Sequence, residues 1–486
     1  MTLDGGNEIK PVPERPDEAQ VPAVGVDSWV ATHAGRSSRT RLQELIDRAP
    51  RPAFYLAFGI AAALLPALTS DLYIVRVGFD TMLYMLLALG LNVVLGYAGL
   101  LDLGYIAFYG FGAYGYAMLA SPKFGLHWDA LLIIPIVILA TAVLGLLVAL
   151  PSRRLVGDYL AIVTLFFLQL FVTVYQNGQR IFGHDVTGGP NGIPNVDNWK
   201  LAGIHVSSVK AYYYAALITF LIVLSAIYLV ERSRTGRAWK SLREDPLAAE
   251  MMGMPVNRLK LIAFVCGAAI GGLTGTLFAA LNTAVFTADF DVPTLIIVYA
   301  MLILGGAGSL GGVIIGAMVV NISLEILRTP GHATTIFYFL LLVSLLAFLR
   351  PWRAFVVVVG GSLALGFVLH AILASAWPRS THGTSEIGGW LGSFLRHWSI
   401  QPTNVSQIGN WAYILLVLAV LGLTLLHGWW RWLAMIPVIN LGAFVWNNVL
   451  VVEPSITRLI LIGVILIVLM NVRPQGLLGT SRVEIV

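Results

Sequence analysis

The sequence predicts an all-α, polytopic membrane protein, and two observations carry this prediction. Hydrophobic residues make up 58% of the 486 residues and charged residues only 11%, whereas soluble domains carry roughly 25% charged residues. Apolar runs of about 18 residues or more recur along the chain, and a helix of that length crosses a hydrocarbon core of roughly 30 Å. The runs lack the alternation of a membrane β-barrel strand, so helices are expected.

About 14 transmembrane helices are expected from these apolar runs, within a range of about 12 to 14. Their starting points lie near Ala53, Val77, Leu100, Ala130, Tyr159, Ala211, Leu261, Thr294, Val313, Thr335, Ala354, Trp411, Leu433 and Thr457. The Gly-rich stretches 96–115 and 305–316 change the count if either forms a broken or re-entrant helix. Glycines at GxxxG spacing, as in Gly267, Gly271 and Gly275, are expected to let neighbouring helices pack closely.

The distribution of Lys and Arg predicts the orientation of the spans. Basic residues recur in every second loop and are densest in the loop 231–260, and the positive-inside rule assigns such loops to the cytoplasm. Residues 1–50 are rich in Pro and charged residues and contain no signal-peptide core, so a disordered cytoplasmic tail is expected. The sequence therefore predicts a multi-pass protein of the bacterial cytoplasmic (inner) membrane, with both termini in the cytoplasm.

No catalytic, metal or cofactor site is expected, and the chain is not expected to be an enzyme. A protein that hydrolyses ATP needs a phosphate-binding loop such as G-x-x-x-x-G-K-[ST], and the nearest stretch, 305–312, lacks the Lys. The nine histidines include no close pair at metal-ligand spacing. Any energy from ATP would therefore come from a partner.

The carboxylates in or beside the expected spans are Asp80, Asp102, Asp158 and Glu325. Charged groups are costly at membrane depth and are retained there mainly where they function. Each of these acids lies near an expected span end or a Gly-rich break, so we interpret them as interfacial or helix-capping groups. The alternative is a proton or ion relay. It would make the chain a stand-alone secondary transporter or channel, with Asp102 and Glu325 as its best candidates.

The most charged loop, 231–260, is expected to contain a short helix. Asp245 can cap a helix that begins with Pro246, because proline lacks the N–H that would be unpaired there. The helix is expected to include residues 247–252 and to end at Gly253. Its apolar face would consist of Leu247, Met251 and Met252. Such a face suits docking to a separate ATPase, and an amphipathic loop lying on lipid headgroups is the alternative.

These residues resemble the LivM-type permeases of branched-chain amino acid ABC importers. The segment 236–245 is similar to the cytoplasmic loop of that family, and Ala248-Ala249 followed by Gly253 is similar to part of the importer coupling motif. Leu247 stands where the broader motif has Glu, so no salt bridge to the ATPase is expected from this position. The resemblance implies an ATPase-coupling loop formed by Arg243, Glu244, Asp245, Leu247, Ala248, Ala249 and Gly253.

Further stretches resemble the family in the same order along the chain. They are the Gly-rich segment 91–114, the span start 157–164, the loop 187–193, the segment 305–312 and the closing segment 473–478. In the family the loop corresponding to 187–193 is an outer loop. The resemblance therefore implies an outer-mouth loop formed by Gly189, Pro190, Asn191 and Gly192.

Residues 329–456 depart from the family pattern, in which the closing segment follows soon after residue 327. We interpret them as an insertion with about four extra membrane helices, because they contain apolar runs of sufficient length. The expected organisation is a tail at 1–50, a permease core at 51–328 that contains the coupling loop 231–260, the insertion at 329–456, and a last span with a short cytoplasmic tail at 457–486.

The resemblance implies a permease subunit that translocates branched-chain amino acids, driven by separate ATPase subunits and fed by a soluble binding protein. The implied partners are a second homologous permease subunit, two ATP-binding subunits, an extracytoplasmic substrate-binding protein and the lipid bilayer. No nucleic acid is expected, because the basic residues form no single basic face. The alternative cargo is urea or a short amide, since the spans show no obvious site for the charged ends of an amino acid.

Overall fold

The computed structural model describes residues 51–152, 158–180, 185–201, 204–349, 352–376, 389–400, 402, 406–426, 428–450, 463 and 476–478. The expected N-terminal tail, the last expected span and the side chain of Asp158 lie outside this part of the chain. The first described helix, α3 (Arg51–Leu68), begins in a unit made of residues 1–61 and 481–486. The other described elements belong to a second unit, residues 62–480.

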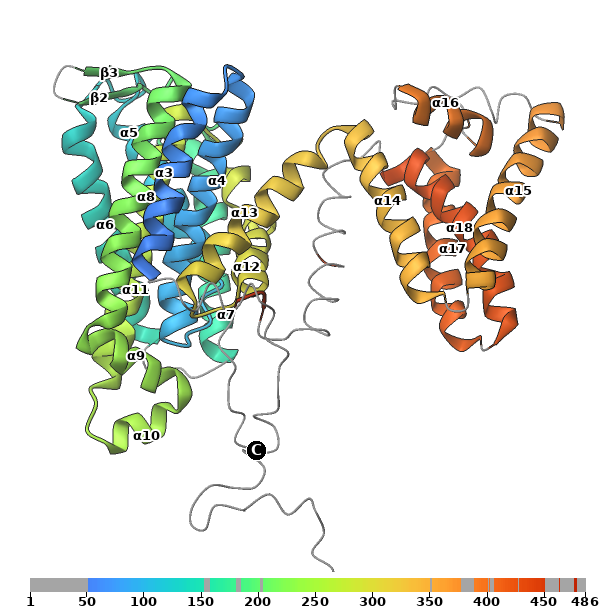
Figure 1. Cartoon of the computed structure of the whole chain (residues 1–486). Coiled ribbons are helices and arrows are strands. Elements are labelled where there is room, and N and C mark those ends of the chain that lie inside the picture. The colour runs from blue at the N-terminus through green and yellow to red at the C-terminus, as the bar shows by residue number, and fades with distance from the viewer. Residues whose placement is uncertain are drawn as a thin grey trace, which may run out of the picture. The chain divides into compact units, whose positions relative to one another are not determined.

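Most of the region predicted to be a permease core, residues 51–328, is a bundle of long helices (Figure 1). In chain order they are α4 (Leu72–Leu91), continued by the π-helix η1 (Asn92–Tyr97), then α5 (Tyr105–Leu119), α6 (Ala130–Ser152), α7 (Asp158–Gln176), α8 (Val209–Arg232), α9 (Arg234–Glu244), α10 (Pro246–Met251), α11 (Val256–Asn282), α12 (Val292–Gly305) and α13 (Leu310–Ile326). Helix α11 is the central element and packs against α4, α5 and α6.

Small residues bring α11 close to its neighbours. A Cβ atom at Gly275 would overlap the carbonyl oxygen of Tyr109 on α5, and one at Gly112 of α5 would overlap the carbonyl oxygen of Gly272. A Cβ at Gly267 would likewise overlap the side chain of Val94 in η1. The close packing predicted from the GxxxG spacing is confirmed, because the backbones approach where side chains are missing.

Short strands and 3-10 turns gather at one end of the bundle. Strand β1 (Ile193–Pro194) pairs antiparallel with β4 (Ala284–Val285), and β2 (Trp199–Leu201) pairs antiparallel with β3 (Ile204–Val206). The turns are η2 (Gly178–Arg180), η3 (Gly189–Asn191) and η4 (Thr287–Phe290). Helix α8 leads from β3 to α9, and its 24 residues extend roughly 36 Å. The strands and α9 therefore lie at opposite ends of the bundle (Figure 1), which we call the β2 end and the α9 end.

The region predicted to be an insertion is also helical. It contains α14 (Pro330–Phe348), α15 (Trp352–Ala376), α16 (Gly389–Trp398), α17 (Ser406–Leu425), α18 (Trp429–Val445) and η6 (Trp446–Leu450). Helix α18 packs against α15 and α17. The buried ring of Trp446 is stacked on Phe337, with ring centroids 4.0 Å apart. The boundaries of the insertion stay a prediction.

The all-α, multi-pass architecture is confirmed. Eight helices in the described part of the chain are long and apolar enough to cross a membrane, or up to nine if the bent pair Leu310–Ile326 and Gly331–Leu346 forms one span. Every expected span start from Ala53 to Leu433 falls on a helix or shortly before one. The expected number of about 14 spans stays a prediction. Helix α5, for example, has only 15 residues, whereas a membrane-crossing helix needs about 20.

Candidate functional site

The loop between α8 and α11 folds into two helices, and α9 is held firmly against the bundle. Ser233 caps α9, since its hydroxyl oxygen accepts the N–H of Gly236 at 3.3 Å. The indole of Trp239 is fully buried and donates from Nε1 to the carbonyl of Leu259 at 2.9 Å. Leu242 is also buried. Because Leu259 lies in the first turn of α11, a displacement of α9 would act directly on the central helix.

Arg243, at the end of α9, connects both Gly-rich stretches. Its Nη1 atom donates to the carbonyl of Gly96 at 2.5 Å and to the carbonyl of Ala307 at 3.4 Å. The two stretches also contact each other, because the N–H of Gly308 donates to Oδ1 of Asn92 at 2.8 Å. Gly308 has a φ of +87°, and a Cβ there would overlap the guanidinium of Arg243. Glycine is therefore required at this contact.

The closing segment of the chain reaches the same place. The N–H of Leu477 donates to the carbonyl of Leu304 at 2.8 Å, and that of Leu478 donates to the carbonyl of Gly305 at 3.1 Å. Both acceptors lie in the last turn of α12, where helical carbonyls lack partners. Segments 92–99 and 305–308 thus meet at Arg243, and 476–478 packs on the adjoining end of α12. We call this meeting point the glycine junction.

Both Gly-rich stretches contain a turn between two helices. Stretch 96–115 includes the end of η1, the turn before α5 and most of α5, and stretch 305–316 includes the turn between α12 and α13 and the start of α13. Asp102, in the first turn, is buried, and its Oδ1 accepts the N–H of Gly104 at 2.9 Å. Its carbonyl accepts the hydroxyl of Tyr299 at 2.7 Å. In this arrangement Asp102 orders the turn before α5.

The short helix predicted in the loop is present as α10. Oδ1 of Asp245 accepts the N–H groups of Leu247 and Ala248 at 2.8 and 3.0 Å, and Pro246 occupies the first turn. Gly253 ends the helix with a φ of +78°. The N–H of Met254 donates to the carbonyl of Ala249 at 3.1 Å, as expected for a glycine-terminated helix.

The surface of α10 is apolar and uncovered. Leu247, Met251 and Met252 are 75%, 90% and 82% exposed. Ala249 is buried against the rest of the loop, while Ala248 and Glu244 are exposed. An uncovered apolar helix face beside charged residues suits a partner's groove. Of the residues predicted for the coupling loop, only Arg243 reaches the glycine junction, and the others lie on α10 or beside it.

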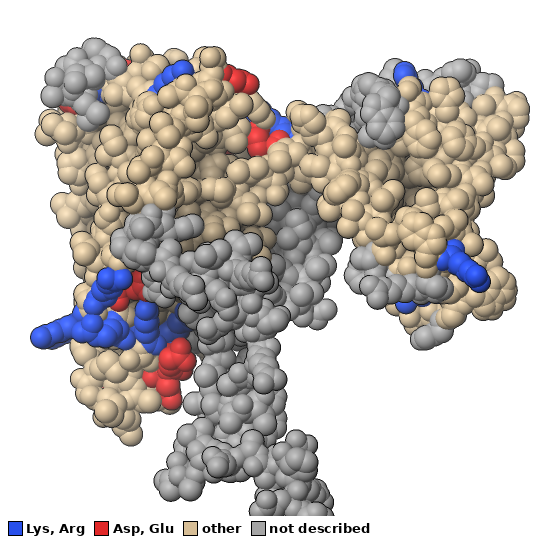
Figure 2. Space-filling model, viewed as in Figure 1, with Lys and Arg blue, Asp and Glu red and all other residues tan. Residues whose placement is uncertain are grey.

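Basic side chains lie beside this surface, on the side of α9. Lys and Arg are concentrated at the α9 end in Figure 2. Lys240 forms an ion pair with Glu231, with Nζ and Oε1 2.9 Å apart, and its Nζ lies 6.0 Å from the ring centroid of Tyr97. The pattern agrees with the charge distribution predicted for an inner loop.

The predicted outer-mouth loop lies at the β2 end. Gly189, Pro190 and Asn191 form η3, and Gly192 follows with a φ of +62°. A Cβ at Gly192 would overlap the carbonyl oxygen of Val285 in β4. Glycine at this position therefore allows the loop backbone to pack on β4.

Polar contacts fix the start of this loop. Oδ1 of Asp185 accepts the N–H of Gly188 at 2.7 Å and pairs with Nζ of Lys123 at 2.9 Å. The hydrogen bond from Lys123, with help from the Gly188 N–H, holds the pKa of Asp185 below its ordinary value. Gln179 donates from Nε2 to the carbonyl of Gly188 at 3.0 Å. The loop is thus a preformed surface.

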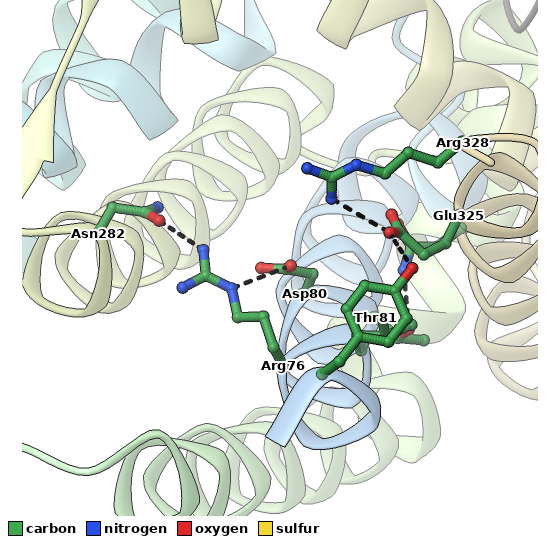
Figure 3. A network of polar contacts seen from close by, with 9 residues as sticks. Arg76, Asp80, Thr81, Asn282, Glu325 and Arg328 are labelled. Atoms are coloured by element: carbon green, nitrogen blue, oxygen red, sulfur yellow. Dashed lines mark hydrogen bonds and ion pairs between the residues drawn. The ribbon is translucent and has the colours of Figure 1, made fainter. Parts of the chain in front are cut away.

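The partners of Arg243 could not be predicted from the sequence. Asn92, Gly96 and Gly308 lie in recognisable motifs, but no regular spacing relates them to residue 243. Another missed set is the polar network of Arg76, Asp80 and Asn282, which Figure 3 shows between α4 and α11. The four-residue spacing of Arg76 and Asp80 was a usable signal, because such residues share one helix face.

The fold and the site define a multi-pass helical membrane protein in which an exposed loop helix is connected to the core through a glycine junction. The family model for the branched-chain amino acid transport system / permease component matches residues 73–349. The chain belongs to this permease family.

The relatives include both kinds of branched-chain amino acid permease. The chain is 37% identical over 297 residues to the high-affinity branched-chain amino acid transport system permease protein LivM of Escherichia coli, covering 56% of this chain and 67% of the relative. It is 25% identical over 257 residues to LivH of Salmonella typhimurium, covering 49% and 80%. A fructose import permease, FruG of Bifidobacterium longum, is 25% identical over 202 residues, covering 40% and 58%. No solved structure matches the chain.

Proposed function

We propose that this chain is one permease subunit of an ABC importer that carries branched-chain amino acids across the cytoplasmic membrane. Family membership and the similarity to LivM support the transport role. The structural observation that supports coupling to an ATPase is the uncovered apolar face of α10, next to an α9 helix whose Arg243 contacts the glycine junction.

In this proposal the α9 end lies in the cytoplasm, and both termini lie on that side. An ATP-binding subunit receives Leu247, Met251 and Met252 in a groove. When the two ATP-binding subunits close on ATP, they displace α10 and α9. Arg243 transmits the displacement to η1 and to the turn between α12 and α13, and Trp239 transmits it to α11. The pathway then changes the side of the membrane to which it opens.

The remaining partners follow from the same assignment. A second permease subunit completes the pathway, which suits a chain that resembles both LivM and LivH. An extracytoplasmic binding protein delivers the substrate at the β2 end, where the loop 189–192 offers a preformed surface. ATP hydrolysis belongs to the partner ATPases and not to this chain.

Other cargoes remain alternatives within the same machinery. Urea or a short amide is one, and the similarity to FruG favours testing fructose as well. The alternative of a stand-alone transporter depends on Glu325 and Asp102, and the contacts of these two residues indicate structural roles. Glu325 accepts the hydroxyl of Tyr73 at 2.6 Å and pairs with Arg328 at 3.2 Å, and Asp102 orders a turn.

The test is uptake into proteoliposomes that contain this chain with its permease partner, ATPases and binding protein. Radiolabelled leucine, urea and fructose are compared with and without ATP. Leucine uptake that needs both ATP and the binding protein supports the proposal. Uptake of urea or fructose without uptake of leucine would support the same mechanism with a different cargo. Leucine movement through this chain alone, without ATP, would overturn the importer assignment.

A further inference from the structure

A polar site lies on α4, in the half of the helix that is nearer the β2 end. Nε of Arg76 and Oδ2 of Asp80 are 3.2 Å apart, and Nη2 of Arg76 donates to Oδ1 of Asn282 at 2.5 Å. Figure 3 shows the three side chains pointing toward one another from α4 and α11. The side chains of Arg76 and Asp80 remain 35% and 36% exposed.

The position of this ion pair along α4 is unusual for exposed charges. Arg76 and Asp80 lie four and eight residues after Leu72, the first residue of the helix, roughly 6 and 12 Å along its axis and inside the candidate membrane span Leu72–Tyr97. Within a span an exposed ion pair is costly against lipid and is tolerated against water or another protein. The surface around Arg76 and Asp80 therefore faces a water-filled path or the second subunit.

The ion pair has unused hydrogen-bonding capacity. The guanidinium of Arg76 has five N–H donors, and a carboxylate has two acceptor oxygens. Among the described residues, Nη1 of Arg76 and Oδ1 of Asp80 have no hydrogen-bond partner. An open cationic donor and an open anionic acceptor thus lie side by side and accessible, which matches the two charged ends of a zwitterion.

The surroundings add further charge and polarity. Glu325 of α13 accepts the hydroxyl of Tyr73 on α4 at 2.6 Å and pairs with Arg328 at 3.2 Å (Figure 3). From the same helix, Nδ2 of Asn321 donates to the hydroxyl of Thr81 at 2.8 Å. The pair thus lies on α4 beside α11, and α13 carries further polar groups that contact α4; all three helices belong to the predicted permease core and not to the predicted insertion.

We propose that Arg76 and Asp80 bind the α-carboxylate and the α-ammonium group of an amino acid on its way through the permease. This inference rests on the proposed function and names the part of the substrate that is recognised. Nη1 of Arg76 donates to the carboxylate, and Oδ1 of Asp80 accepts from the ammonium group. The contacts use only the groups that all amino acids share, so the site serves leucine, isoleucine and valine alike.

The experiment uses the complete reconstituted importer with Arg76→Gln and Asp80→Asn, both close in size to the native side chains. The readouts are leucine uptake and ATP hydrolysis stimulated by the leucine-loaded binding protein. We expect uptake to fall by about tenfold or more while stimulated hydrolysis stays within about twofold, because one charge-assisted contact to the substrate is lost. Arg353→Gln is the matched control, since it removes an exposed arginine of α15, in the predicted insertion and outside the site, and should change neither readout.

Each other outcome overturns the proposal. Normal uptake in both variants would show that the pair does not contact the substrate, and loss of both uptake and hydrolysis would show that it supports assembly instead. A double variant, Arg76→Asp with Asp80→Arg, restores an ion pair with reversed polarity, so recovered uptake would assign a structural role. The unmodified importer is measured first, and failure of its ATP-dependent leucine uptake would count against the proposed function itself.

Discussion

Nη1 of Arg243 lies 2.5 Å from the carbonyl oxygen of Gly96, a residue 147 positions earlier in the chain. This contact connects the loop that carries α10 to the first Gly-rich stretch. The same nitrogen lies 3.4 Å from the carbonyl oxygen of Ala307, in the second Gly-rich stretch. One side chain therefore links η1 to the turn between α12 and α13, and its removal breaks both of these hydrogen bonds.

Arg243→Ala is expected to uncouple transport from ATP hydrolysis. The loss of a charged donor at two carbonyls should lower leucine uptake per ATP by about tenfold, since such hydrogen bonds contribute about 1.5–3 kcal/mol. The ratio of leucine uptake to ATP hydrolysis is obtained by measuring both in the same proteoliposomes. The matched control is Arg237→Ala on the exposed side of α9, where Nη1 donates to the nearby carbonyl of Arg232 and to no other group in the described part of the chain. An unchanged ratio in the Arg243 variant would contradict the transmission route.

Met251→Glu is expected to prevent the ATP-binding subunits from associating with the permease. Met251 is 90% exposed on the apolar face of α10, and a carboxylate there would lose its water in the partner's groove without gaining a counter-ion. Co-purification of the ATP-binding subunits from detergent extracts measures the association. Glu250→Gln, at the neighbouring exposed position, should leave it intact. If the Met251 variant still binds the subunits normally, α10 does not enter a groove on them.

Much of the candidate site could be predicted from the sequence because its signals are local. Asp245, Pro246 and Gly253 determine where α10 begins and ends through hydrogen bonds that span only a few residues. The density of Lys and Arg around α9 depends on composition alone. These features needed no knowledge of the tertiary structure.

The contacts that connect this loop to the core could not be predicted in the same way. Arg243 meets Gly96 and Ala307 only because α9 packs on η1 and α11 while α12 packs on α4, and no spacing along the chain encodes that arrangement. The sequence also suggested that Asp80 is an interfacial or capping group. In the structure it pairs with Arg76, and the four-residue spacing on one helix face would have indicated this pair.

Gly253→Val is expected to lower coupled uptake through backbone strain and not through a clash. No atom lies within 4 Å of a Cβ at this position, but φ is +78°, a conformation that costs non-glycine residues about 1–3 kcal/mol. Asn tolerates this region better than Val. Gly253→Asn should therefore retain most of the uptake at an equal amount of protein in the membrane. Equal losses in both variants would mean that the size of the side chain, and not the backbone conformation, decides the effect.

Gly192→Ala is expected to destabilise the β2 end and to weaken the response to the binding protein. A Cβ there would overlap the carbonyl oxygen of Val285, so β1 and β4 would have to separate. Gly125→Ala is the matched control, because Gly125 has a similar φ of +66° and no atom within 4 Å of its Cβ. Thermal unfolding in detergent should show a midpoint several degrees lower for Gly192→Ala than for Gly125→Ala. Binding-protein-stimulated ATP hydrolysis should fall only in the Gly192 variant, and an equal fall in both would mean that backbone strain alone explains the loss.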